Sequence, residues 1–275
     1  MTSDPLFSVE AKVVVVTGGL GQIGAEVVRA LHARGARVAV LGRTATPDLA
    51  REVLGESYVD KRLAIFQADI TDRGSIDRAL DSLEVLWGTP DALINNAGLD
   101  TQPSAPPEVS GPFEDFPVEV FREVVEVNLL GTFLMVQAVG KRMRAGGRSG
   151  SIVNVGSIYG MLSPVQDLYA YRAEHGSPFT KPVAYSASKS GIYNLTRYCA
   201  TYWGRSGIRV NTLTPSGVAR ESQDKTFQAN YTSRIPIGRM AEPNEFNAAV
   251  IFMISDGSRY MTGSNVVVDG GWTAW

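Results

Sequence analysis

Tyr185 and Lys189 stand four residues apart in the run "AYSASK", at the start of a helical pattern. Side chains at this spacing lie on the same helix face, one turn apart. A phenol ionises at about pH 10 and is a poor base at neutral pH. An ammonium group one turn away favours the phenolate and lowers its pKa. The pair therefore predicts acid/base chemistry, although this spacing also arises by chance on surface helices.

Two further polar residues are candidate partners of that pair. Ser157 follows the apolar run "SIVNV", at the expected carboxyl edge of a sheet, where ligands of open α/β sheets bind. Asn128 interrupts an apolar helical stripe in "FREVVEVNLLGTF". Ser157 could instead cap a helix, and Asn128 could satisfy a backbone group across a helix interface. The residues alone leave both alternatives open.

Short apolar runs that alternate with amphipathic stretches must position these side chains. Continuous Val/Ile runs suit strands buried on both faces, and strand–helix alternation predicts a parallel sheet covered on both sides. We expect strands at residues 13–16, 37–41, 62–66, 91–95, 151–155, 208–213 and 265–269. Helical periods fill most gaps, for example at residues 22–33, 121–143 and 184–203. The pattern predicts one doubly wound α/β domain over residues 1–275.

A glycine-rich turn follows the first expected strand. Gly19, Gly21 and Gly24 satisfy G-x-G-x-x-G between a strand and a helix, the context that gives this pattern meaning. Glycines allow positive φ and close approach of a pyrophosphate, and the helix N-terminus supplies free N–H groups. A tight turn without a ligand would use glycines too.

The end of the second strand bears on the choice of nicotinamide cofactor. An acidic residue there binds the ribose 2′-hydroxyl, and a basic one accommodates a 2′-phosphate. This chain has Gly42 and then Arg43. The sequence therefore favours NADP, with NAD possible and a solvated surface arginine as the alternative.

Composition argues against several other classes of protein. A formal net charge of −2 gives no electrostatic case for binding nucleic acid or an acidic membrane. Two histidines and the single Cys199 offer little material for a metal site, and we expect none. The apolar runs are strand-sized, shorter than the roughly 20 residues that span a bilayer, and the N-terminal residues lack the pattern of a secretion signal. We expect a cytoplasmic protein that binds neither nucleic acid nor a membrane.

Taken together, the motifs resemble the short-chain dehydrogenase/reductase family over residues 12–272. The segments that carry the resemblance are "TGGLGQIG", "DI" at 69–70, "NNAG", Asn128, Ser157, "YSASK", "RVNTLTPSG" and "VDGGW". Each is weak or moderate alone, but the ordered set is specific. The resemblance implies a single-domain Rossmann fold and hydride transfer between nicotinamide C4 and a carbonyl or alcohol carbon.

The resemblance also implies roles for individual residues. Tyr185 would be the general acid/base, and Lys189 would bind the nicotinamide ribose and lower the tyrosine pKa. Ser157 would orient the substrate oxygen, and Asn128 would hold the lysine's water in a proton relay. Asp69 and Ile70 would flank the adenine. The full set of expected cofactor contacts is Gly18, Gly21, Gln22, Ile23, Gly24, Arg43, Asp69, Ile70, Asn96, Ala97, Gly98, Tyr185, Lys189 and Val218.

The chain departs from the family pattern in three places. Gln22 stands where a glycine is usual, and "PSGV" replaces the common Pro-Gly pattern after the sixth strand. Ser157 and Tyr185 are 28 positions apart, about twice the usual separation. Prolines in the extra segment, at about residues 160–183, exclude a continuous helix. We expect a looped-out insertion beside the active site with Tyr169, Arg172 and His175 as candidate substrate contacts, or else a surface or interface excursion.

The segments expected to rim the substrate site are polar: residues 99–117, the insertion, and residues 219–236. Polar rims suit polyhydroxylated substrates, because a site tells hydroxyls apart through paired polar groups. The chain looks similar to the gluconate 5-dehydrogenase-like branch, which implies a sugar, sugar acid or activated sugar as the polar carbonyl or alcohol substrate. By resemblance we also expect a homo-oligomer, a dimer or tetramer, formed through helices 121–143 and 184–203.

Two alternatives are kept beside that hypothesis. A 3-oxoacyl-thioester reductase uses the same catalytic residues and needs a basic patch near the pocket mouth for its carrier. Lys141, Arg142, Arg144 and Arg148 are candidates for that patch, or form a solvated helix end. A non-catalytic, cofactor-sensing protein on the same fold is the alternative from another class.

Overall fold

A computed structural model describes residues 4–58, 60–101, 105–106 and 109–275. Seven parallel strands form one sheet in the order β3-β2-β1-β4-β5-β6-β7. The strands are β1 Val13–Thr17, β2 Arg37–Gly42, β3 Leu63–Gln67, β4 Ala92–Asn95, β5 Gly150–Val155, β6 Ile208–Pro215 and β7 Asn265–Val268. Each strand predicted from an apolar run is present, with ends that differ from the prediction by one or two residues.

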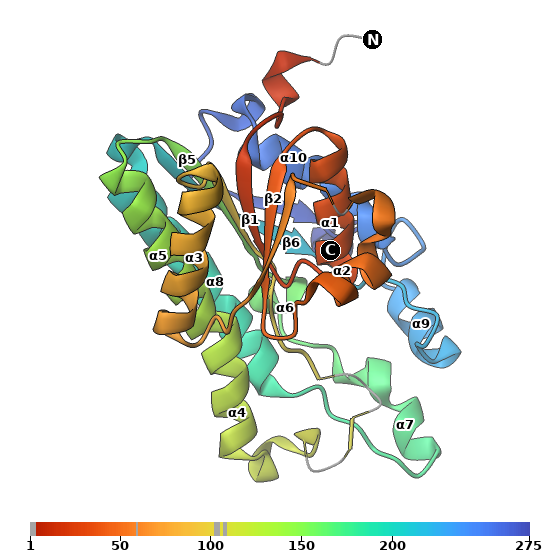
Figure 1. The fold of residues 1–275 in the computed structure, drawn as a ribbon. Helices are drawn as coiled ribbons and strands as arrows, with labels where there is room; N and C mark the ends of the chain where they lie inside the picture. Colours follow the sequence, from red (N-terminus) through yellow and green to blue (C-terminus); the bar gives the residue numbers. More distant parts are fainter. Residues whose placement is uncertain (1–3, 59, 102–104, 107–108) are drawn as a thin grey trace.

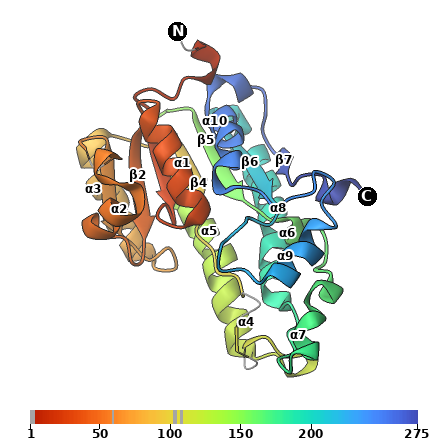
Figure 2. The ribbon, with the colours of Figure 1, turned by 90° about the vertical axis from the view of Figure 1, so that its right-hand side faces the viewer.

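Helices cover both faces of the sheet (Figures 1 and 2). They are α1 Gln22–Ala33, α2 Pro47–Leu54, α3 Arg73–Trp87, α4 Val118–Val125, α5 Thr132–Ala145, α6 Ile158–Met161, α7 Tyr171–Glu174, α8 Val183–Trp203, α9 Lys225–Thr232 and α10 Asn247–Ile254. One core cluster joins α1, α2 and α10 to the sheet, and a second joins α3, α5 and α8 to its other face. This two-sided core explains why the strand sequences are apolar at consecutive positions.

The long helix predicted around Asn128 is three segments in line. α4 and α5 flank a π-helical turn, Glu126–Gly131, which carries Asn128. By length and composition alone, the whole segment Val118–Ala145 could cross a membrane, which the sequence analysis did not anticipate. Half of its most apolar window is buried inside the protein, and Met135 and Val139 belong to the core. We therefore interpret the segment as a core helix of this fold.

A third cluster of buried side chains lies at the carboxyl edge of the sheet, away from the two main cores. It consists largely of aromatic residues from the insertion, from α9 and from the C-terminal region. Tyr169 of the insertion stacks on Phe227 of α9 with ring centroids 5.6 Å apart, and it packs against Phe179 at 4.9 Å. The insertion is thus not a loose loop: it contains α7 and buries aromatic side chains against α9.

Candidate active site

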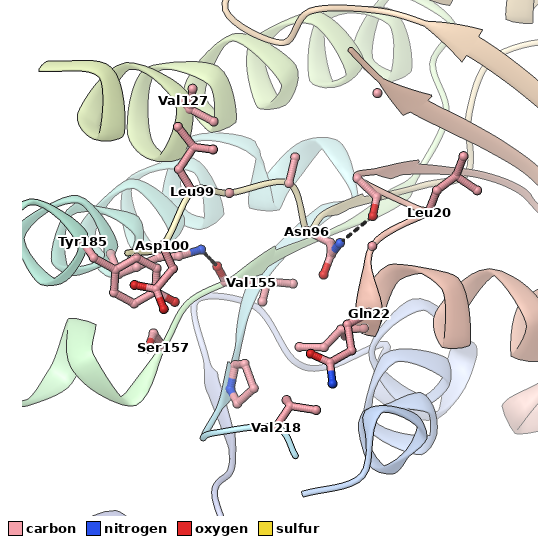
Figure 3. A pocket seen from close by; sticks show the side chains of 18 of the residues that line it. Leu20, Gln22, Asn96, Leu99, Asp100, Val127, Val155, Ser157, Tyr185 and Val218 are labelled. Carbon is pink, nitrogen blue, oxygen red and sulfur yellow. Dashed lines mark hydrogen bonds between the residues drawn. The ribbon is translucent and has the colours of Figure 1, made fainter. Parts of the chain in front are cut away.

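One cavity of about 610 Å³ opens at the carboxyl ends of the strands (Figure 3). Its lining comes from the segments that directly follow β1, β2, β3, β4, β5 and β6. The switch point of the sheet lies there, because the chain winds outward in opposite directions from β1 and β4. Open α/β sheets bind ligands at such a crevice.

The glycine turn leaves no room for side chains where it meets the neighbouring strand. Gly18 has φ +62°, and a Cβ there would lie 2.9 Å from Ala97 Cα. A Cβ on Gly24 would lie 2.2 Å from the Gly18 carbonyl oxygen and 2.8 Å from Asn96 Nδ2. Gly21 is the N-cap of α1, so free N–H groups of the helix face the cavity. This cradle fits a dinucleotide pyrophosphate.

Gln22, which replaces the usual glycine, connects the two walls of the cavity. Its Nε2 donates to the Ala219 carbonyl oxygen at 2.6 Å, and its Oε1 accepts from Arg220 Nε at 2.6 Å. Both partners belong to the segment that follows β6. The departure from the family pattern therefore ties the glycine turn to the loop that contains Val218, another cavity residue.

The adenosine end is bordered by residues after β2, β3 and β4. Arg43 is exposed at the cavity and has no acidic residue in the position before it. Asp69 binds the Thr71 hydroxyl and N–H, and these bonds, with help from the Arg43 charge, lower the pKa of its carboxyl. Asn96 Nδ2 donates to the Gly18 carbonyl oxygen at 3.0 Å, which links this end to the glycine turn.

Ser157, Tyr185 and Lys189 meet at the other end of the cavity. Lys189 Nζ lies 5.9 Å from the Tyr185 ring centroid and donates to the Val155 carbonyl oxygen at 2.8 Å. Burial lowers the pKa of Lys189 to about 8, so its ammonium is lost as pH rises through that value. Burial also raises the pKa of Tyr185 above its ordinary range, and the negative charge of Asp100 raises it further. The hydrogen bond from Ser157 opposes this rise.

Ser157 also caps a helix, as the alternative in the sequence analysis allowed. It is the N-cap of α6, and its Oγ accepts from the Tyr159 N–H at 3.2 Å. Its carbonyl oxygen accepts from the Tyr193 hydroxyl at 2.8 Å. These contacts fix the serine backbone and leave its hydroxyl beside Tyr185 (Figure 3).

Asn128 is fully buried behind the cavity wall and does not line it. Its Nδ2 donates to the Leu99 carbonyl oxygen at 2.9 Å and to Ser188 Oγ at 3.0 Å, while its Oδ1 accepts from the Leu99 N–H at 2.7 Å. The side chain therefore clamps the loop after β4 against α8. Lys189 is close by, since both approach the same side of Gly98. The relay role of Asn128 stays a prediction.

The other predicted contacts divide into two groups. All the expected cofactor residues line the cavity except Gly24, which packs just behind the turn. Among the candidate substrate contacts, Tyr169 lines the cavity, but Arg172 and His175 lie on and just after the short helix α7, outside the wall. Residues 102–104 and 107–108 of the expected rim lie outside the described part of the chain.

Two of the four basic residues considered as a carrier patch, Arg142 and Arg148, have acidic partners at the opposite edge of the sheet. Arg142 pairs with Asp77, Asp81 and Glu84 of α3. Arg148 pairs with Asp91 at 2.6 Å, just before β4 begins. None of the four basic residues lines the cavity, and the group lies at the end of α5, far along the strands from the pocket mouth.

Sequence reasoning missed three charged cavity residues: Asp100, Lys181 and Arg220. Asp100, two positions after "NNAG", and Lys181 of the insertion form an ion pair of 2.5 Å in the cavity wall. The position of Asp100 directly after the β4 motif was a usable signal. No periodicity or spacing points to Lys181. Tyr159, Phe227, Tyr231 and Met240 are further lining residues that were not predicted.

Comparisons with known proteins agree with this geometry. Residues 19–273 match a family model described as enoyl-(acyl carrier protein) reductase. A D-threitol dehydrogenase of Mycolicibacterium smegmatis is 34% identical over 97% of this chain and 95% of its own. A short-chain dehydrogenase of Leptospira borgpetersenii with bound NAD+ has a TM-score of 0.85 and 36% identity, covering 99% of this chain and 97% of its own.

A gluconate 5-dehydrogenase of Burkholderia cenocepacia, solved with NADP and tartrate, has a TM-score of 0.83 and 27% identity over 98% of both chains. The predicted Rossmann fold and the predicted family are thereby confirmed. On its sequence, its sheet and its match over nearly the whole length, the chain belongs to the short-chain dehydrogenase/reductase family.

Proposed function

We propose that this protein oxidises a secondary hydroxyl group of a sugar or polyol with NAD(P)+, and catalyses the reverse reduction, with Tyr185 as the general acid/base. The observation that carries the proposal is the meeting of Ser157, Tyr185 and Lys189 at the end of a cavity that begins at a dinucleotide-type glycine turn. The substrate class is supported by the D-threitol and gluconate dehydrogenases to which the chain is similar.

In this mechanism the residues of the chain bind and orient the substrate oxygen and move its proton. The Ser157 hydroxyl and the Tyr185 phenol both hydrogen-bond the reacting oxygen. In oxidation, Tyr185 takes the hydroxyl proton, and in reduction it returns one. The Lys189 ammonium, retained at neutral pH, stabilises the phenolate. The cofactor, held by the glycine turn and by Lys189, would supply the acceptor for the hydride that leaves the carbinol carbon.

NADP is the proposed preferred cofactor, with NAD as a second one. Arg43 is exposed at the adenosine end and follows the neutral Gly42, so a 2′-phosphate meets a positive charge and no carboxylate at that position. The similar structures from Leptospira and Burkholderia contain NAD+ and NADP respectively. Both cofactors therefore occur among close structural relatives.

The two alternatives have less support. None of the basic residues proposed for a thioester carrier lines the cavity, and Arg142 and Arg148 are engaged in salt bridges with α3 and with Asp91. A non-catalytic sensor would not need Tyr185 and Lys189 buried together beside Ser157. No described feature of the cavity favours either alternative over alcohol oxidation.

We also propose a cytoplasmic homo-oligomer. Apolar side chains are exposed on the helices that the sequence analysis assigned to the interface: Leu130, Phe133, Tyr198 and Tyr202. Tyr198 and Tyr202 stack on the outer side of α8 with ring centroids 6.1 Å apart. Sedimentation of the purified chain tests the assembly, and a monomer at micromolar concentration would contradict it.

The substitution Tyr185→Phe tests the function. We expect it to lower kcat for oxidation of D-threitol by at least about a thousandfold, because the phenol that takes the proton is gone. NADP+ binding, followed by fluorescence titration, should change less than about threefold, since the ring is retained. Wild-type rates in the variant would exclude Tyr185 as the acid/base.

A further inference from the structure

An ion pair between a buried lysine and a partly exposed aspartate stands at the substrate end of the cavity. The Lys181 ammonium donates to Asp100 Oδ1 at 2.5 Å and to the Thr101 carbonyl oxygen at 2.8 Å. The Lys181 side chain is 5% exposed, whereas that of Asp100 is 34% exposed. The pair therefore turns its carboxylate toward the cavity and keeps its ammonium in the wall.

The insertion holds this pair in place from behind. Gln166 accepts from the Lys181 N–H at 2.9 Å and donates to the Lys181 carbonyl oxygen at 3.1 Å. Lys181 Nζ lies 5.4 Å from the centroid of the Tyr185 ring. An extra segment that separates Ser157 from Tyr185 in sequence thus delivers a fixed cation to the proposed acid/base and its neighbour Asp100.

The Asp100 carboxylate lies close to the reacting groups. Figure 3 places Asp100 with Tyr185 and Ser157 at one end of the cavity. Its charge contributes to raising the pKa of Tyr185 and opposes the lowering of the pKa of Lys189. Within the described residues, Oδ1 accepts the Lys181 bond and Oδ2 accepts none.

We infer that Asp100, anchored by Lys181, accepts a hydrogen bond from a second substrate hydroxyl beside the reacting carbinol, so that the site selects neutral vicinal diols and polyols over monohydroxy alcohols and over hydroxy acids. The inference rests on the proposed function and narrows its substrate class. Of the two substrate types named by the relatives, it favours the neutral polyol over the sugar acid.

Two physical arguments carry this choice. A carboxylate oxygen facing a cavity loses hydration when a substrate binds, and the loss is offset only by a substrate group that donates a hydrogen bond. A monohydroxy alcohol has no such group. A substrate carboxylate would face Asp100 as a like charge, while the Lys181 ammonium, already bound to two oxygens and nearly buried, is not accessible to it.

The test uses the full chain and three four-carbon probes with the same carbon count. They are 2,3-butanediol, 2-butanol and 2-hydroxybutyrate, each as a mixture of stereoisomers, with NADP+ and with NAD+. The variants are D100N, which removes the charge, and D100L/K181M, which removes the acceptor without leaving an unpaired ammonium in the wall. D48N, on the exposed side of α2, is the matched control.

For the wild type we expect kcat/KM for the diol to exceed that for 2-butanol by about 10- to 100-fold and that for the hydroxy acid by at least as much. D100N should reduce the diol preference about tenfold. D100L/K181M should bring diol and monohydroxy alcohol within about threefold of each other, chiefly by loss of diol turnover, and D48N should match the wild type. NADP+ affinity should stay constant throughout.

An unchanged diol preference in D100L/K181M, or a wild-type preference for the hydroxy acid, would overturn the inference. Equal wild-type turnover of diol and 2-butanol would overturn it too, yet leave the proposed dehydrogenase activity standing. A wild-type protein that binds NADP+ but oxidises none of the probes nor D-threitol would instead contradict the proposed function itself, and the inference with it.

Discussion

The two ends of the cavity are built by different means. At the cofactor end, the shape comes from backbone: Gly18 and Gly24 have no space for a Cβ, and the first N–H groups of α1 face inward. At the substrate end, it comes from side chains of the insertion and α9, such as Tyr169, Lys181 and Phe227. A backbone site accepts one shape of ligand, whereas a side-chain wall can change its selectivity by single substitutions.

The largest expected effect is at the cofactor end. In Gly24→Ala the new Cβ would meet the Gly18 carbonyl oxygen at 2.2 Å, so the turn itself has to move. We expect NADP+ affinity to fall by about a thousandfold, since positioned backbone N–H groups hold the pyrophosphate. Gly204→Ala, at a position with open space around it, is the control. Fluorescence titration measures both, and normal affinity in Gly24→Ala would refute a backbone-defined site.

Substitutions in the aromatic wall of the substrate end should lower the stability of the protein and leave cofactor binding unchanged. Phe227 is 7% exposed and packs between Tyr169 and Tyr231. Phe227→Ala should lower the free energy of unfolding by about 3 kcal/mol, through lost burial and the remaining cavity. Phe113→Ala, at a side chain that is 72% exposed, should change it by less than about 0.5 kcal/mol. Urea denaturation separates the cases, and equal effects would contradict a packed aromatic wall.

The same contrast explains what the sequence could predict. The strands, the glycine turn and the Tyr185–Lys189 pair follow from local periodicity and spacing, and their predicted positions agree with the structure to within one or two residues. The insertion carries no such period. Tyr169 and Arg172 looked equally suitable as substrate contacts, but packing against Phe179 and Phe227 turned only Tyr169 to the cavity.

Contacts between residues that are far apart in the sequence could not be predicted either. Lys181 meets Asp100 across 81 positions of sequence, and Gln22 meets Ala219 across 197. Neither contact has a local signature, because each depends on where the folded sheet brings two loops together. Asn128 shows the intermediate case: its interruption of an apolar stripe was visible, but its bonds to Leu99 and Ser188 were not.

A smaller effect is expected for the choice of cofactor. Arg43→Ala should weaken NADP+ binding about tenfold and change NAD+ binding less than about twofold, because only the 2′-phosphate carries the charge that Arg43 meets. Arg34→Ala, an exposed arginine at the end of α1, is the matched control. Parallel titrations with the two cofactors give the answer. Equal losses for both cofactors would mean that Arg43 supports the shared adenosine.

The smallest expected effect is a shift in pH dependence. Oxidation needs the deprotonated Tyr185, and burial together with the Asp100 charge raises the pKa of that phenol. Oxidation should therefore speed up as pH rises above neutrality, and reduction should slow over the same range. In D100N the negative charge is gone, so the pKa of the phenol falls and the rise of the oxidation rate with pH moves to lower pH.

The probe for this shift is 2-butanol, because it has no second hydroxyl for Asp100 to bind and reports only on the acid/base. D100L/K181M removes both charges of the pair. The pH at which its oxidation rate rises should therefore stay closer to the wild-type value than in D100N. Tyr159 and Tyr193, two other titratable residues near the phenol, are kept in both variants. Lys189 is kept as well, but without the Asp100 charge its pKa is lower still, so its ammonium is lost at a lower pH. If the oxidation rate of D100N rises at the same pH as that of the wild type, the Asp100 charge does not affect the pKa of Tyr185. The ion pair would then act on the substrate alone.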